Sequence, residues 1–361
     1  MIIVFAACLL FFILSGLGIG TRGKWAFSRQ LLGKTGYCSR EMTASVNGYF
    51  LTTVFMTHLI QYMSSDIYGP LDFMYTSVNR ALGQLIVAMF LFYSGFGVME
   101  SILHKERYII SFPKHRILPF FVNFEIAACI YLVVSCVTGQ TPTFRYAVKG
   151  FLAWESLGNS NWYVFAILYL YVVTYVVFRV RETKIFRKIP MFAAVCGIVF
   201  FSGIYILWMR YEEKGGWWYD TILCYSAGMF FALFRSSFEM WLSSKRSHLR
   251  YLLCLIGTAV FFSIFYAMRT DHKLYFEIIS VSFAMLVVLL SMRFRAYNRV
   301  YTYIGQNLFS FYIYQRIPMI FLKDSLGTVN PVLYLLVCAV LTAAISFVMI
   351  RFYRRLKKYL P

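Results

Sequence analysis

Apolar runs of membrane-spanning length alternate with short polar connections along the whole chain. An α-helix needs about 20 mostly apolar residues to cross the hydrocarbon core of a bilayer. The pattern predicts about eleven such helices, over residues 2–20, 44–63, 81–101, 118–138, 162–178, 191–209, 217–234, 251–268, 274–292, 303–322 and 332–350. We therefore expect an all-α fold, a polytopic bundle of transmembrane helices.

The first apolar run stands apart from the other ten. Its positive charges follow the run and do not precede it, which is not the pattern of a cleaved secretion signal. We expect residues 1–35 to form an extra transmembrane helix with a basic linker, and residues 36–361 to form the main membrane domain. The segment 144–154 has apolar residues at helical spacing and is expected to lie on the outer membrane surface as an amphipathic helix.

The basic residues divide unequally between two alternating sets of connections. One set holds 26 of the 35 Lys and Arg residues and the other holds eight. Basic connections stay on the cytoplasmic side of a membrane. We therefore predict a multi-pass protein of the cell membrane, with its N-terminus outside and its C-terminus in the cytoplasm. The net charge of +20 also suits anionic lipids or a polyanionic ligand.

Composition agrees with a membrane protein and argues against other classes. The chain is 60% hydrophobic and only 14% charged, which is too apolar for a soluble domain. Its eight cysteines show no C-x-x-C pair and no metal-ligand spacing, so we expect neither disulfides nor a metal site. Because topology explains the positive charge, nucleic acid is not an expected partner.

One histidine, His58, lies inside a predicted span, whereas the other four lie in connections. An ionisable group at membrane depth is costly and usually faces a polar cavity or a working site. A structural imidazole bonded to a neighbouring helix is an equally good reading of this residue alone. Asn47 lies eleven residues earlier on nearly the same helical face, about 16 Å nearer the cytoplasm.

Three other polar features lie at or near membrane depth. A basic loop ends just before a helix expected to begin at Leu118 or Pro119, and cations beside a helix N-terminus suit phosphate. Topology alone would also explain those cations. The polar sequence Asn161-Trp162-Tyr163 enters a span, and the run 303–322 is unusually rich in polar residues. Glu125, within another predicted span, is a possible counter-ion for Arg316 or His58, and a pairing with a basic group near the inner edge is an equally good interpretation.

In this order, the motifs resemble those of the acyltransferase-3 family of integral membrane acyltransferases, which O-acylate exported glycans and other extracytoplasmic acceptors. The resemblance runs from about Gly36 to the C-terminus, beyond the extra first span, and corresponds to the family's usual ten-helix unit. It rests on the span with His58, on Phe92-Tyr-Ser-Gly-Phe-Gly97, on Arg116-Ile-Leu-Pro119, on Asn161-Trp-Tyr163 and on Ile304-Gly-Gln-Asn-Leu-Phe-Ser-Phe-Tyr-Ile-Tyr314. The chain departs from the usual family pattern at Asn47, near Ala166 and at Gln315-Arg316.

The resemblance implies transfer of an acyl group, expected to be acetyl, from cytoplasmic acetyl-CoA to a hydroxyl of an exported or lipid-linked glycan. His58 would act as a general base or would carry the acyl group itself, and Asn47 and Arg316 would assist the reaction. The expected donor-binding residues are Arg107, Lys114, His115 and Arg116. The expected acceptor-binding residues are Trp162, Tyr163, Tyr314 and Gln315.

Two other functions share this composition. A polysaccharide flippase would have a charged central cavity, and a polymerase would have a large outward loop. A secondary transporter would usually have inverted repeats or paired broken helices. The sequence shows none of these features, and the acyltransferase reading is preferred.

The charge pattern makes a topological prediction. A reporter that is active only in the cytoplasm should give signal when it is fused after Pro361. The reason is that basic connections stay in the cytoplasm, and the C-terminus is expected on their side of the membrane. The same reporter placed in the connection 139–161 should be silent. A silent fusion after Pro361, with fused protein present in normal amounts, would contradict the predicted orientation.

Overall fold

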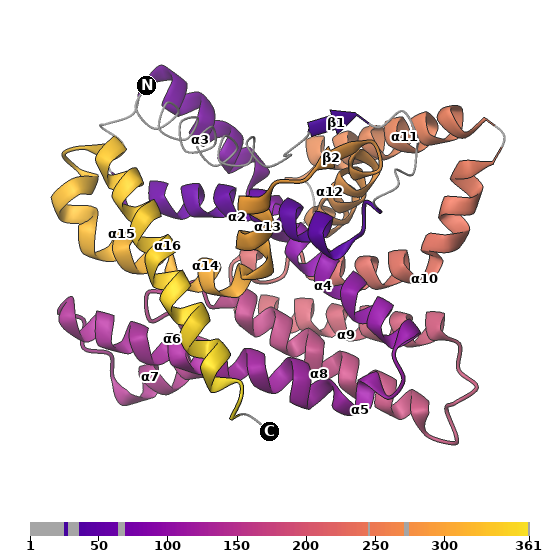
Figure 1. The fold of residues 1–361 in the computed structure, drawn as a ribbon, viewed down its shortest axis with the longest axis horizontal. Coiled ribbons are helices and arrows are strands. Elements are labelled where there is room, and N and C mark those ends of the chain that lie inside the picture. The colour runs from indigo at the N-terminus through magenta and orange to yellow at the C-terminus, as the bar shows by residue number, and fades with distance from the viewer. Residues whose placement is uncertain (1–24, 28–35, 64–68, 245, 271–273, 360–361) are drawn as a thin grey trace.

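The computed structural model describes residues 25–27, 36–63, 69–244, 246–270 and 274–359 (Figure 1). The predicted first span, residues 2–20, lies outside the described residues. The described chain is almost entirely helical. The α-helices are α2 (Arg40–Ile60), α3 (Pro70–Leu82), α4 (Leu85–His104), α5 (Tyr108–Phe112), α6 (Leu118–Val137), α7 (Phe144–Phe151), α8 (Trp162–Glu182), α9 (Met191–Tyr211), α10 (Leu223–Ser243), α11 (Ser247–Ala267), α12 (Tyr275–Ser291), α13 (Arg299–Gln306), α14 (Leu308–Tyr314), α15 (Arg316–Leu322) and α16 (Pro331–Leu356).

Short irregular elements join these helices. π-helical turns cover Pro113–Ile117 and Lys323–Gly327, and a 3-10 turn covers Gly216–Trp218. Two three-residue strands, β1 (Trp25–Phe27) and β2 (Phe294–Ala296), pair antiparallel. They are a minor addition to the all-α fold.

Seven helical stretches among the described residues are long and apolar enough to cross a membrane. They are Leu85–His104, Tyr108–Val137, Trp162–Glu182, Met191–Tyr211, Gly216–Ser243, Ser247–Ala267 and Pro331–Leu356. The shorter apolar helix α12 and the 21-residue helix α2 match two further predicted runs. The structure therefore confirms a polytopic, all-α membrane protein.

The run 303–322 is not the single helix that the sequence predicts. It is divided among α13, α14 and α15, with breaks at Asn307 and Gln315. At each break the side-chain amide donates a hydrogen bond to a nearby backbone carbonyl, from Asn307 to Tyr303 and from Gln315 to Tyr312. Such bonds compete with the regular helical ladder. The structure therefore replaces the one helix expected over this run with three shorter helices.

Glycines let two pairs of helices make direct backbone contact. A Cβ added at Gly305 of α13 would lie 1.8 Å from the carbonyl oxygen of Ala44 in α2. One added at Gly95 of α4 would lie 1.9 Å from the carbonyl oxygen of Tyr225 in α10. Small residues permit such close approach between membrane helices. Because α2 also packs on α4, the two crossings fix the centre of the bundle (Figure 1).

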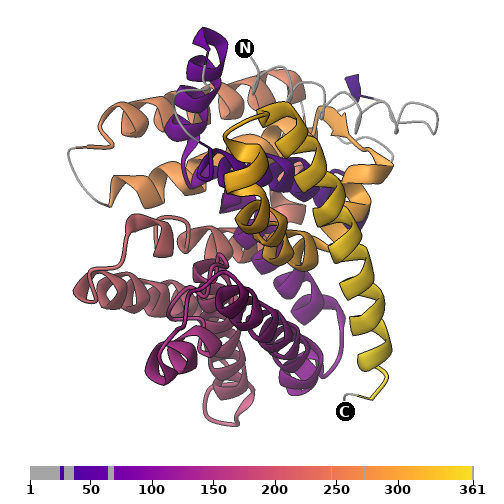
Figure 2. The same cartoon turned by 90° about the vertical axis from the view of Figure 1, so that its left-hand side faces the viewer.

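Peripheral helices complete the bundle around this centre. Among its described residues α11 buries only Tyr251, and it lies at the edge of the molecule (Figure 1). Its apolar side chains, such as Leu253, Ile256 and Val260, are exposed in the isolated chain, as expected for helices that contact lipid. Helix α16, yellow in Figure 2, lies along one side of the molecule.

The expected amphipathic helix after residue 143 is present as α7. The Thr143 hydroxyl caps its N-terminus by accepting a hydrogen bond from the backbone N–H of Tyr146. This cap satisfies one of the donors that a helix N-terminus leaves unpaired. The position of α7 at the outer membrane surface remains a prediction.

The α4–α10 crossing makes a testable prediction with a matched control in the same helix. Gly95→Ala should destabilise the protein by roughly 1–3 kcal/mol, the usual effect of overpacking. Gly97→Ala should not, because a Cβ there meets nothing within 4 Å and alanine favours a helix. The measurement is the midpoint of thermal unfolding in detergent. Equal midpoints for the two variants would contradict the close crossing.

Candidate active site

Two cavities with polar and charged linings lie along helix α2. The first, here called the arginine cavity, has a volume of about 610 Å³ and is lined by Arg40, Arg116, Arg354 and Lys357 among other residues. The second, here called the histidine cavity, has a volume of about 880 Å³ and is lined by His58, Gln61, Ser160, Tyr312 and Arg316 among others. Asn47 of α2 lines the first cavity and His58 of α2 lines the second.

The arginine cavity is formed where several helix ends meet. Arg40 is the first residue of α2, and Arg354 and Lys357 come from the end of α16. The Tyr353 hydroxyl donates a hydrogen bond to the carbonyl of Pro119, which fixes the end of α16 against the start of α6. None of the described residues that line this cavity is acidic. The cavity is therefore suited to a polyanion.

Arg116 enters the arginine cavity from the π-helical turn before α6. Its guanidinium carbon lies 5.9 Å from the centroid of the Tyr171 ring, in cation–π geometry. The amide side chains of Asn47, Asn123 and Gln306 add hydrogen-bonding groups to the lining. Positive charge and neutral amides thus face the same space.

His58 lies in the last turn of α2 and is only 7% exposed. Its Nε2 lies 3.2 Å from the hydroxyl oxygen of Ser160, which comes from the connection between α7 and α8. Its Nδ1 makes no hydrogen bond with any described residue. One ring nitrogen is therefore oriented by Ser160, and the other has no hydrogen-bond partner in the described part of the chain.

Arg316, the first residue of α15, lines the same cavity. Its guanidinium donates hydrogen bonds to the Gln61 side-chain oxygen at 2.7 Å and to the Tyr62 hydroxyl at 3.4 Å. Both partners are neutral, and no described carboxylate forms an ion pair with Arg316. Its positive charge is therefore available to negative charge that develops in the histidine cavity.

Two aromatic rings separate the cavities beside His58. Tyr163 lines the arginine cavity and Tyr312 lines the histidine cavity, and their ring centroids are 5.4 Å apart. The Tyr312 ring in turn lies 6.2 Å from the imidazole of His58. At this point the wall between the cavities is one pair of tyrosines thick.

The structure separates the predicted site residues into groups. His58, Arg316 and Trp162 line the histidine cavity, whereas Asn47, Arg116 and Tyr163 line the arginine cavity. Three predicted donor-binding residues are exposed and line neither cavity, namely Arg107, Lys114 and His115. Two predicted acceptor-binding residues are buried outside the histidine cavity, namely Tyr314 and Gln315.

Two predicted polar residues lie away from His58. Asn47 lines the arginine cavity, in agreement with its expected position about three helical turns before His58 on α2. Glu125 pairs with neither His58 nor Arg316 among the described residues, and its buried Oε1 makes no hydrogen bond there. Neither residue therefore contributes directly to the histidine cavity.

The phosphate site expected at the helix N-terminus before Leu118 lacks the free backbone N–H groups of an ordinary helix start. Helix α6 begins at Leu118 as expected, but it continues directly from the π-helical turn Pro113–Ile117, and residues 108–137 form one helical stretch. The backbone N–H of Leu118 donates to the carbonyl of Pro113 and is not free for a ligand. Only the side chain of Arg116 connects this loop to the arginine cavity.

Burial also affects a thiol near the start of α2. Removal from water is the main cause that raises the pKa of Cys38 to about 12, and the nearby Arg235 only partly opposes it. The thiol form, which is a poor nucleophile, therefore persists at neutral pH. Cys38 lines neither cavity.

Sequence reasoning missed several lining residues. Arg40, Arg354 and Lys357 were assigned only to topology, although their positions at helix ends bring them into one cavity. Ser160 stands directly before the Asn161-Trp162-Tyr163 motif, yet only the fold shows that it reaches His58. The basic residues at helix ends and the Asn161-Trp162-Tyr163 motif thus marked regions of interest in the sequence. Neither pattern predicted which residues are in contact.

The fold and its two cavities define an integral membrane protein that holds a buried histidine in a mixed polar and aromatic cavity, next to a basic one. A family model described as an acyltransferase domain matches residues 48–351, and the chain belongs to the acyltransferase-3 family. It is therefore a membrane-bound acyl-transfer enzyme, and this favours the predicted enzyme over a flippase, a polymerase or a transporter. No curated protein and no solved structure matches the chain.

Proposed function

We propose that the protein moves an acyl group, specifically acetyl, from cytoplasmic acetyl-CoA to a hydroxyl of an exported or lipid-linked glycan. The main observation in support of this function is the pair of cavities separated by Tyr163 and Tyr312 beside His58. The donor enters from one cavity and the acceptor from the other. Residues 36–361 form the catalytic unit in this proposal, and residues 1–35 are an addition to it.

The arginine cavity is the donor site. Coenzyme A carries several phosphate charges, and Arg40, Arg116, Arg354 and Lys357 supply cations without a competing carboxylate in the lining. These four residues come from three connections of the set that the charge pattern assigns to the cytoplasm. This agreement supports the proposed orientation, with the N-terminus outside and the C-terminus in the cytoplasm.

The histidine cavity is the acceptor site. Its lining includes the indole rings of Trp154, Trp162, Trp217 and Trp218, together with side-chain amides such as that of Asn79. Indole rings pack well on the apolar faces of sugar rings, and amides bond to hydroxyl groups. Its loops belong to the set with few basic residues, as expected for the outer side.

The reaction takes place beside the tyrosine wall. For the donor's thioester to reach His58, the rings of Tyr163 and Tyr312 must move apart. The acceptor hydroxyl attacks the thioester carbonyl while the imidazole of His58 takes its proton. The guanidinium of Arg316 stabilises the oxyanion. The thiolate of coenzyme A then leaves and receives the proton from the imidazolium.

Ser160 orients the imidazole in this scheme. If the Nε2–H group donates to the serine hydroxyl, the lone pair of Nδ1 becomes the base. A second route has His58 accept the acyl group before passing it to the acceptor. Single-turnover experiments without acceptor distinguish the routes, because only the second traps a labelled acyl group on the protein.

One prediction of the proposed function concerns the imidazole of His58. His58→Ala and His58→Gln should each lower acyl transfer at least ~10²-fold, because neither side chain can accept a proton near neutral pH. The matched control is His104→Gln, since His104 is exposed and its Nδ1 bonds only to the Glu100 backbone and carboxylate in its own helix. The measurement is acyl-CoA-dependent release of free thiol, with folding checked by size-exclusion chromatography. Near-native turnover of a folded His58→Gln protein would show that the imidazole is structural.

Another prediction compares substitutions of two basic residues in the same loop, Arg116 and Lys114. Arg116→Gln should raise the Michaelis constant for acetyl-CoA roughly tenfold, equivalent to about 1.4 kcal/mol, because Arg116 lines the arginine cavity. Lys114→Gln removes an equal charge two residues away but outside that cavity and should change the constant little. The Michaelis constant for acetyl-CoA should become less sensitive to salt concentration in the Arg116 variant and not in the Lys114 variant. Similar effects of both substitutions would mean that the loop acts through general charge.

A further inference from the structure

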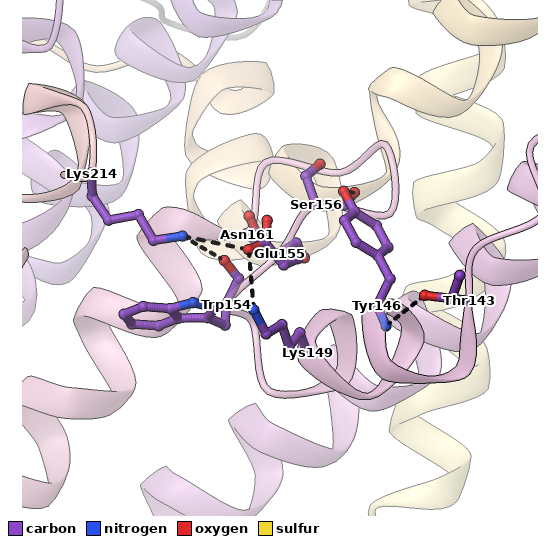
Figure 3. Close-up of polar contacts among 8 residues, drawn as sticks. All are labelled: Thr143, Tyr146, Lys149, Trp154, Glu155, Ser156, Asn161 and Lys214. Carbon is purple, nitrogen blue, oxygen red and sulfur yellow. Dashed lines mark hydrogen bonds and ion pairs between the residues drawn. The ribbon is translucent and has the colours of Figure 1, made fainter. Parts of the chain in front are cut away.

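The connection between α7 and α8, residues 152–161, is held in place at several points. The side-chain amide of Asn161 donates to the carbonyl of Glu155 at 2.5 Å, and the Tyr146 hydroxyl donates to the carbonyl of Ser156 at 2.9 Å. Figure 3 shows these residues together. Most of the contacts join the connection to α7 or to itself. They shape the connection, but they do not tie it to the opposite side of the cavity.

Two lysines reach the same carboxylate from different elements (Figure 3). Lys149 of α7 lies 3.9 Å from the Glu155 carboxylate, and Lys214 of the connection after α9 lies 3.8 Å from it. The side chain of Lys149 is 41% exposed, whereas that of Lys214 is 17% exposed. Of the two lysines, Lys214 therefore links the α7–α8 connection to the α9–α10 side of the histidine cavity, where Trp154 also contacts the rings of Trp208 and Trp218.

The Lys214 ammonium has additional partners that Lys149 lacks. It donates a hydrogen bond to the carbonyl of Trp154 at 3.4 Å. It also lies 4.4 Å from the centroid of the Trp154 ring and 4.9 Å from that of Trp218. Cation–π contacts strengthen as the cation loses water. The contacts made by Lys214 are thus stronger than an exposed ion pair of the same length.

We propose that Lys214 is a positioning residue for His58, a role that rests on the proposed function. It fixes the α7–α8 connection across the histidine cavity through Trp154 and Glu155, and that connection delivers the Ser160 hydroxyl to the imidazole. Loss of the Lys214 contacts removes the charged part of this attachment, leaves the ring contacts of Trp154 with Trp208 and Trp218, and gives the connection more freedom to move. Ser160 then no longer holds the imidazole in one orientation, and proton transfer slows.

The test compares two variants, each of which removes one of the two lysine ion pairs with Glu155. Lys214→Met should lower the turnover number about tenfold, since small displacements of a catalytic group have large kinetic effects. The Michaelis constant for acetyl-CoA should not change, because the arginine cavity is formed by other elements. The turnover number of Lys149→Met should stay within about twofold of that of the parent protein. Lys214→Arg should keep most of the parent turnover number because arginine retains the positive charge.

Hydrogen exchange gives a second readout that does not depend on activity. Lys214→Met should accelerate amide exchange over residues 152–161, whereas Lys149→Met should not. Equal kinetic effects of the two lysine variants, or unchanged exchange over 152–161 in Lys214→Met, would overturn the proposal. A parent protein without acyl transfer would instead overturn the proposed function, and the exchange comparison would still decide the structural role of Lys214.

Discussion

The close contact of α2 with α13 is the constraint on which both cavities depend. Gly305 lies against the carbonyl of Ala44, and Gly48 lies against that of Tyr301, so the two backbones touch. This contact holds α2 at the centre of the bundle while leaving its two ends to face different spaces. One helix therefore carries Asn47 in the arginine cavity and His58 in the histidine cavity.

The break between α13 and α14 is a second consequence of that arrangement. A continuous helix over residues 299–322 would have its backbone bonds satisfied internally, as lipid requires. Here the carbonyl of Tyr303 accepts from both the backbone N–H and the side-chain amide of Asn307, and residues 305–310 line the arginine cavity. Irregular backbone at membrane depth is tolerated where it is enclosed by protein or lines a cavity. The departure from regular helix thus occurs beside a candidate substrate site.

The two cavities differ in a way that suits two substrates. The arginine cavity has cations and no acidic lining residue, whereas the histidine cavity contains acids, cations, amides and indole rings. A strongly charged donor and a hydroxyl-rich acceptor need these different environments. The tyrosine pair keeps them apart, and His58 lies beside that wall. In the proposed reaction, the wall limits the loss of acyl groups to water because the thioester reaches the imidazole only when the rings part.

The sequence by itself determined the polytopic all-α class, the family and His58 as the notable polar residue, because hydrophobic length, charge and motif order are local properties of the chain. It did not determine that Arg116 faces a cavity while Lys114, two residues away, does not, because that depends on which helices pack against the loop. It also could not show that Ser160, 102 residues from His58, supplies the hydroxyl beside the imidazole. Such contacts arise from the relative placement of helices, which close packing at glycines and short connections fix only in the folded protein.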